Sequence, residues 1–109
     1  MQAIVRIRIK NEEIFMGKGV KEVLSAIDQL GSIKKASEET RISYPKIMRM
    51  LQTFKKELGF SAVTSNKGGS SRGGTQLTEK GKAVLKSFCE IESEVESFAQ
   101  KLVQNKFRF

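Results

Sequence analysis

Apolar and charged residues alternate strictly near the start of the chain. Between positions 5 and 10 every second residue is apolar: Val5, Ile7 and Ile9 alternate with Arg6, Arg8 and Lys10. A period of two residues predicts a strand with one buried face. After the polar run 11–13, the apolar residues 14–16 are expected to form a short partner strand. Residues 1–16 are therefore predicted to form an N-terminal β-hairpin.

The spacing of apolar residues becomes helical between residues 17 and 60, where three helices are predicted. The first is expected to end at Gly31, and Ser32 to cap a short second helix that runs to about Thr40. Ser43 is expected to cap the third helix, which Gly59 ends. The predicted buried residues are Val20, Val23, Leu24, Ile27 and Leu30 in the first helix, Ile33 and Ala36 in the second, and Ile47, Met50, Leu51, Phe54 and Leu58 in the third.

Residues 61–78 are predicted to form two short strands around a loop. Strand-like pieces at 62–65 and 75–77 flank the segment 66–74, which is rich in Gly and Ser. Such a segment cannot bury a core and is typical of an exposed loop. Thr78 is expected to cap a last helix, with Glu79 in its first turn.

The last predicted helix, residues 78–105, carries an uninterrupted heptad pattern of apolar residues. At 1.5 Å per residue it would be about 40 Å long, more than one small domain covers. We expect its second half to form a homodimer interface; the alternative is that its first half packs on the domain and its end frays. The pattern begins at Val84 and continues through the residues proposed for dimerisation: Phe88, Ile91, Val95, Phe98 and Leu102.

Composition argues against an enzyme and against a metal site. The 109 residues include no His, no Trp and a single cysteine, Cys89. Imidazole bases, a cysteine–histidine pair and a thiolate zinc cluster are therefore excluded, and we expect no catalysis, metal or cofactor. One cysteine allows no internal disulfide, and no stretch resembles a signal peptide or a membrane span of roughly 18 apolar residues. We expect a single cytoplasmic domain over residues 1–109, with no membrane partner.

The net charge of +8 is concentrated in one part of the chain. Residues 31–82 contain eleven cations and four anions, whereas residues 90–100 contain four glutamates and no cation. The excess of cations favours an anionic partner, nucleic acid first and a membrane surface second. The acidic stretch suits a helix that is held away from DNA.

Two short helices joined by a tight turn, followed by two strands around a basic, glycine-rich loop, are typical of a winged helix-turn-helix. The predicted fold class is therefore α+β, mainly α. In this fold the second helix of the pair enters the major groove, and hydroxyl, Lys and Arg side chains contact phosphates or guanine. The alternative is that these polar residues only solvate a helix face. The candidate DNA-binding residues are Ser32 and Lys34, then Ser43, Tyr44, Lys46 and Arg49, and finally Lys67 and Arg72 in the loop, or wing.

These motifs resemble the DNA-binding domain of the molybdate-responsive regulator (ModE) family, and the helix-turn-helix part is similar to LysR-type regulators too. The resemblance implies a dimeric winged-helix domain that binds an operator, with recognition around Ser43, Tyr44 and Lys46. Full-length family members carry C-terminal molybdate-binding domains; these 109 residues contain none, so we expect no molybdate site here. The segments that carry the resemblance are Ala26–Asp28, Gly31–Ile33, Ala36–Ser37, Ser43–Tyr44 and Lys67–Gly81.

The sequence thus predicts a transcriptional regulator that binds duplex DNA sequence-specifically as a homodimer. It does not identify an effector. One alternative is an architectural DNA-binding protein without sequence preference. Another is a protein-interaction module whose basic surface is incidental. RNA binding is less favoured, because one Tyr and mostly buried Phe residues leave few platforms on which bases could stack.

Overall fold

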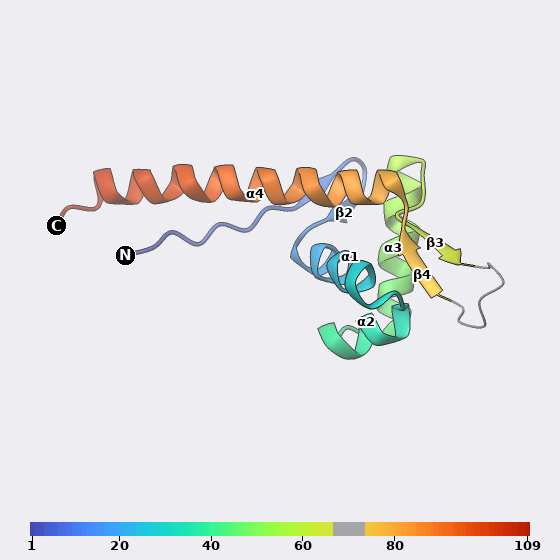
Figure 1. Cartoon of the computed structure of the whole chain (residues 1–109). Coiled ribbons are helices and arrows are strands. Elements are labelled where there is room, and N and C mark those ends of the chain that lie inside the picture. Colours follow the sequence, from blue (N-terminus) through green and yellow to red (C-terminus); the bar gives the residue numbers. More distant parts are fainter. Residues whose placement is uncertain (67–73) are drawn as a thin grey trace.

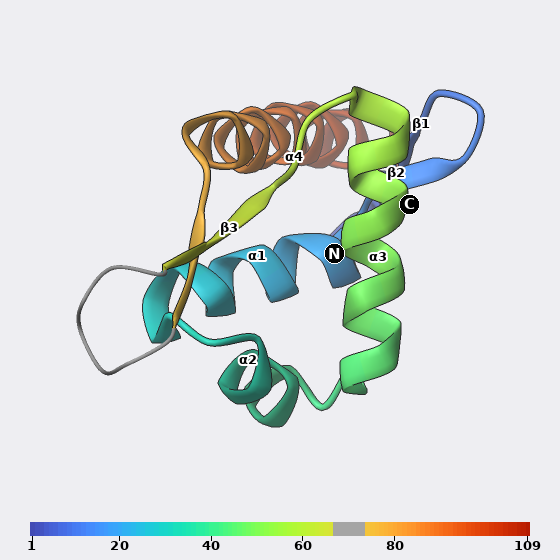
Figure 2. The same ribbon diagram turned by 90° about the vertical axis from the view of Figure 1, so that its right-hand side faces the viewer.

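The computed structural model describes residues 1–66 and 74–109, and its fold is α+β and mainly helical (Figure 1). Three helices and two small antiparallel sheets form a globular body at one end of a long fourth helix (Figures 1 and 2). The elements are β1 (Ile9–Lys10), β2 (Ile14–Met16), α1 (Lys18–Leu30), α2 (Ile33–Thr40), α3 (Tyr44–Leu58), β3 (Val63–Asn66), β4 (Gly74–Leu77) and α4 (Glu79–Lys106).

The N-terminal hairpin is present but shorter than predicted. β1 pairs with β2 only through Ile9 and Lys10, and the predicted strand is wrong for residues 5–8. These residues run beside α4, where the N–H of Ala3 donates to Gln100 Oε1 (3.0 Å) and Gln100 Nε2 donates to the carbonyl of Ala3 (2.9 Å) (Figure 1). The alternation correctly predicted which side chains are sheltered, because residues 5 and 7 are half-buried whereas residues 6 and 8 are exposed. Their neighbour, however, is a helix and not a strand.

The caps of the first three helices lie where the sequence predicted them. Gly31 and Gly59 end α1 and α3 in the left-handed conformation, with φ of 67° and 80°. The Ser32 hydroxyl accepts from the N–H of Lys35, and the Ser43 hydroxyl accepts from the N–H of Lys46. Each contact satisfies a first-turn N–H that has no partner within its helix.

Three residues, 41–43, connect α2 to α3, and side chains of α2 close this turn. Thr40 Oγ1 donates to the carbonyl of Ala36 (2.7 Å) and accepts from the N–H of Ile42 (3.3 Å). Ser37 Oγ donates to the carbonyl of Ile42 (2.6 Å). Arg41 ends α2 with a φ of 60°. Together these contacts fix the direction in which α3 leaves α2.

One hydrophobic core holds the body together. Phe54 of α3 is fully buried at its centre and meets the rings of Phe15 and Phe60 edge to face. The central residues of the apolar faces predicted for α1, α2 and α3 are buried, which confirms these faces, but Leu30 at the end of α1 is exposed. Residues of these faces that are only half-buried are Val20, Ile33, Met50 and Leu58.

The second sheet and the start of α4 are fastened to the body by hydrogen bonds. Thr75 in β4 donates its N–H to the carbonyl of Gly31 (3.0 Å), at the junction between α1 and α2. Thr78 caps α4 as predicted, accepting from the N–H of Gly81 (2.9 Å) and donating to the carbonyl of Ser61 (2.8 Å). Two predicted contact residues, Lys67 and Arg72, lie outside the described residues.

The long helix makes the molecule extended. α4 has 28 residues, and the longest dimension of the chain is 62 Å against 28 and 23 Å for the others. The radius of gyration is 16.5 Å, whereas a compact chain of this length has about 13 Å. We call the part of α4 from Ile91 to Lys106 the arm. The base of the arm contacts the body through Ile91 and Glu92, and the rest projects beyond it with only the N-terminal segment alongside (Figure 1).

Candidate nucleic-acid interface and dimer surface

The first two turns of α3 present a polar face to solvent. Lys46 and Arg49 are exposed and lie one helical turn apart on the same side. Ile47 and Leu51 face the opposite way and are buried in the core. The structure therefore brings four of the predicted DNA-binding residues together at the start of one helix: Ser43, Tyr44, Lys46 and Arg49.

The other two described candidates lie elsewhere. Ser32 and Lys34 lie at the start of α2. The hydrogen bond from Thr75 to the carbonyl of Gly31 holds this end of α2 beside β4. The eight residues of α2 span about 12 Å, which separates these two residues from the start of α3. Figure 2 shows the start of α3 on the side of α2 that is away from β3 and β4.

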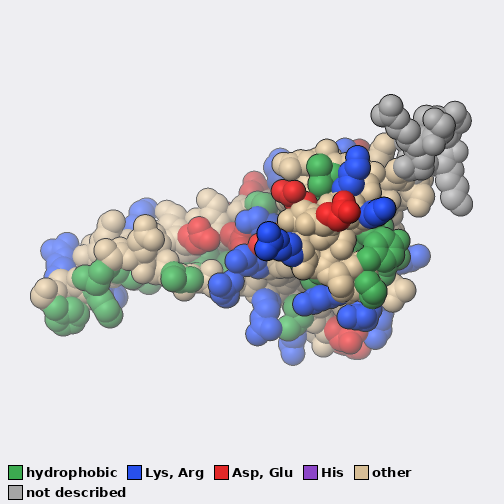
Figure 3. Space-filling model, turned by 90° about the horizontal axis from the view of Figure 1, so that it is seen from below, with side chains coloured by type: hydrophobic (Ala, Val, Ile, Leu, Met, Phe, Trp, Pro, Cys, Tyr) green, Lys and Arg blue, Asp and Glu red, His purple; other side chains and the backbone are tan. Residues whose placement is uncertain are grey.

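The electrostatics of the two helix starts favour an anion. Neither α2 nor α3 has an acidic residue in its first turn. The partial positive charge of each helix N-terminus therefore adds to that of the nearby lysines. The hydroxyl oxygens of Ser32 and Ser43 act as caps, and their hydrogens remain available to donate. Lys and Arg side chains are spread widely over the body in Figure 3.

The other end of α3 is bound to the N-terminal hairpin. Glu57 Oε1 accepts from the N–H groups of Glu12 (2.6 Å) and Glu13 (2.7 Å). Lys56 Nζ donates to Glu13 Oε2 (3.1 Å), and this hydrogen bond raises the pKa of Lys56 above its usual range. The positive charge of Lys56 is thus matched by a neighbour, whereas the cations at the start of α3 have no such carboxylate among the ion pairs of the described residues.

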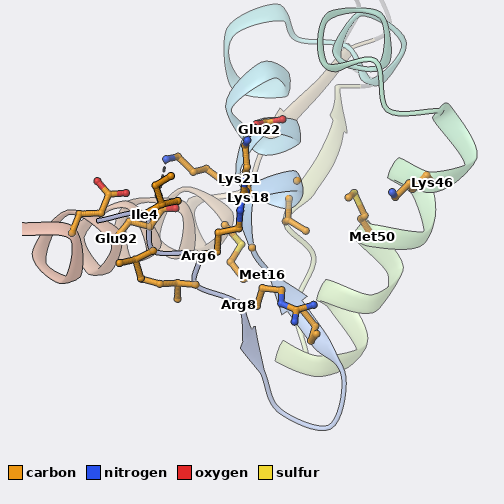
Figure 4. A pocket seen from close by; sticks show the side chains of 17 residues that line it. Ile4, Arg6, Arg8, Met16, Lys18, Lys21, Glu22, Lys46, Met50 and Glu92 are labelled. Carbon is orange, nitrogen blue, oxygen red and sulfur yellow. Dashed lines mark hydrogen bonds and ion pairs between the residues drawn. The ribbon is translucent and has the colours of Figure 1, made fainter. Parts of the chain in front are cut away.

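The sequence analysis missed a second group of cations, which faces α3 across a cleft. The cleft has a volume of about 940 Å³ and separates the N-terminal segment from α1 and α3 (Figure 4). Arg6 and Arg8 line it from the N-terminal segment, Lys18 from the start of α1 and Lys46 from α3. The alternation before residue 10 could have revealed them, because it places both arginines on the face opposite the sheltered apolar side chains.

One ion pair ties α1 to α4 at the edge of this cleft. Lys21 Nζ donates to Glu92 Oε1 at 2.6 Å, and both side chains are partly shielded from solvent. The hydrogen bond to Glu92 raises the pKa of Lys21. This contact holds the base of the arm against α1.

The heptad seam divides at Ile91 into a buried and an exposed part. Phe88, which the sequence analysis assigned to a dimer interface, is only 1% exposed and packs in the core of the body. That assignment needs correction, because this side chain packs in the core of its own chain and only borders the pocket described next. The rest of the seam is exposed: Ile91 by 40%, Val95 by 37%, Phe98 by 64% and Leu102 by 37%. Hydrophobic side chains gather along one edge of the projecting part in Figure 3.

The seam continues into a small apolar pocket on the body. The pocket has a volume of about 280 Å³ and lies between α4, the N-terminal hairpin and the end of α3. Its lining consists of Ile9, Phe15, Met16, Leu58, Ala83, Val84, Ser87, Phe88 and Ile91. Three of these residues, at positions 84, 88 and 91, belong to the heptad seam itself.

Comparison with known proteins gives no family for the chain. No protein-family model matches it, and no curated protein matches it. Among the described residues no group of three or more His, Cys, Asp or Glu side chains is placed to hold a metal ion. Nor does any helix in residues 1–66 and 74–109 have the length and apolar character to cross a membrane.

Proposed function

We propose that this protein binds duplex DNA in a sequence-specific manner and regulates transcription as a homodimer. In this proposal α2 and α3 form a helix-turn-helix, α3 enters the major groove, and β3 and β4 carry a wing. Phosphate contacts supply most of the affinity, and side chains at the start of α3 select the sequence. The resemblance of the sequence motifs to the ModE and LysR-type regulators supports the same assignment.

One observation carries this proposal. Lys46 and Arg49 stand exposed on the outer face of the first two turns of α3, next to a helix N-terminus without acidic residues. The hydrogen-bonded turn at residues 41–43 holds this helix start at a fixed orientation relative to α2. A rigid helix end with long cationic side chains and a projecting Tyr44 is the kind of surface that a major groove accepts.

The test is a pair of alanine variants. Lys46→Ala and Arg49→Ala are each expected to weaken binding to a selected duplex by about 1–3 kcal/mol if the side chain makes a bidentate base contact. Lys86→Ala removes an equal charge from an exposed position of α4, and this control should retain binding. Fluorescence anisotropy of a labelled duplex at constant salt measures all three. Unchanged affinity in both α3 variants would refute the assignment of α3 as the recognition helix.

A further inference from the structure

We propose that two copies of this chain pair through antiparallel arms, and that Phe107 and Phe109 of each copy dock in the apolar pocket on the body of the other. This inference rests on the proposed homodimer and specifies its orientation, its register and its outer contacts. The occupant of the exposed seam is therefore a second copy of the chain.

The distribution of charge along α4 sets the orientation. Residues 90–96 carry four glutamates, whereas Lys101, Lys106 and Arg108 follow nearer the far end. In a parallel pair each residue lies level with the same residue of the partner. The two acidic segments would therefore face each other, and so would the two basic segments. In an antiparallel pair the acidic segment of one copy faces residues 97–103 of the other, which include Lys101 and no acidic residue. The antiparallel arrangement is favoured because it replaces repulsion with attraction.

The exposed apolar residues set the register. In an antiparallel heptad seam, layers form between residues that are equally far from the twofold axis. With the axis between residues 96 and 97, Val95 meets Phe98 of the partner and Ile91 meets Leu102 of the partner. This register leaves no exposed seam residue unpaired. It also places Glu94 beside Lys101 of the partner on the edge of the seam that the N-terminal segment does not cover.

The same register brings the residues after α4 to the pocket. Phe107 lies about ten residues beyond the axis, and Val84 and Ser87 of the pocket lie about ten to twelve residues before it. At 1.5 Å per residue both are about 16 Å from the axis. Phe107 is 57% exposed and Phe109 fully exposed, and their rings contact each other edge to face with centroids 5.5 Å apart. Two exposed rings and an apolar pocket thus meet at one level of the pair.

Spin labels test the orientation and register. In a Cys89→Ser background, a label is attached at position 86 or at position 93, both of which are exposed on α4. The antiparallel register separates the two copies of position 86 by about 32 Å along the helix axis and those of position 93 by about 11 Å, so it predicts a clearly longer distance at position 86. A parallel pair gives short distances of similar size at both positions and overturns the proposal. A protein that stays monomeric at all concentrations overturns it as well.

Two matched pairs of variants test the docked aromatic residues. Phe107→Ala combined with Phe109→Ala is expected to raise the dimer dissociation constant at least about tenfold, while Gln104→Ala on the outer side of the arm leaves it unchanged. Ser87→Trp, which fills the pocket, is expected to weaken the dimer, while Ser93→Trp does not. Sedimentation analysis gives the constants, and circular dichroism checks folding. If both variants dimerise like their controls, the docking is refuted.

DNA binding is measured on the same variants with a duplex that holds a single half-site. A monomeric variant that still binds this half-site leaves the proposed DNA contacts intact, so loss of dimerisation and loss of DNA binding are distinguished. The proposal predicts that result for the Phe107 and Phe109 double variant. Loss of half-site binding in a folded variant would contradict it, because these residues follow α4 and do not belong to the proposed DNA-binding surface.

Discussion

At the scale of single residues, the body depends on a few positions where the backbone comes very close to its neighbours. Gly81 in the first turn of α4 is the tightest. A Cβ atom at this position would lie 2.3 Å from the carbonyl oxygen of Ala62, which is far below van der Waals contact. The close approach allows the Thr78 hydroxyl to make two hydrogen bonds at once. It accepts from the N–H of Gly81, which caps α4, and it donates to the carbonyl of Ser61 just before β3.

Gly81→Ala is therefore expected to destabilise the protein, although alanine favours a helix. Displacing the backbone of Ala62 should cost about 1–3 kcal/mol, more than the helix propensity of alanine returns. Urea denaturation followed by circular dichroism measures the difference. Ser93→Ala at an exposed site of α4 is the control for a small substitution. Equal stability of Gly81→Ala and the wild type would show that α4 can move away from β3 without cost.

The ion pair between Lys21 and Glu92 gives a pH dependence at the same scale. The hydrogen bond to Glu92 raises the pKa of Lys21 above its ordinary 10.5, and Glu96 and Cys89 lie close enough to favour the charged form as well. A raised pKa in the folded state means that this stabilisation is fully present below about pH 10.5 and is lost as the pH rises through the folded pKa.

Lys21→Met should accordingly lose less stability than the wild type between pH 9 and about pH 11.5. Urea denaturation at both pH values measures the two slopes. Lys86→Met makes the same change at an exposed lysine that takes part in none of the ion pairs of the described residues, and it should follow the wild type. If Lys21→Met and the wild type lose the same stability, the pair does not contribute to the alkaline transition.

At the scale of elements, the arm is an exposed helix face with one large apolar side chain at its centre. Phe98 is 64% exposed on the seam. Phe98→Glu is expected to give monomers, because a second copy would have to bury a carboxylate without a partner. Ser97→Glu adds the same charge one residue away, outside the seam, and should remain dimeric. Light scattering measures the mass, and a dimeric Phe98→Glu would contradict pairing through the arm.

The helices were predictable from the sequence because their signals are local. Ser32, Ser43, Gly31 and Gly59 act within one turn of the helix ends that they define, so no knowledge of distant contacts is needed. The heptad pattern likewise predicted α4 to within two residues at each end. The two exposed residues Lys46 and Arg49 followed from the same helical period.

Contacts between distant segments could not be predicted in this way. The alternation at residues 5–8 shows that one face is sheltered, but period two does not say whether a strand or a helix shelters it; the neighbour, Gln100, is far along the chain. The heptad pattern treats Phe88 and Phe98 alike, yet the body covers only Phe88. The cleft between Arg8 and Lys46 also requires the fold, since it joins four separate segments.

At the scale of the whole molecule, basic and apolar surfaces are separated along the long axis. The body holds most of the positive charge, and the arm holds the exposed seam and the acidic stretch (Figure 3). An antiparallel pair of arms would place the two bodies at opposite ends of one assembly. A DNA-binding protein with such twofold symmetry binds two half-sites that form an inverted repeat.

The most direct test of the account is the binding of the chain to pooled genomic duplexes over a series of salt concentrations, followed by sequencing of the retained DNA. Sequence-specific binding by a dimer predicts affinity that falls steeply with salt, together with an enriched motif that contains an inverted repeat. A steep salt dependence without any enriched motif would indicate an architectural protein, and absence of binding even at low salt would contradict the assignment of the α3 surface to DNA.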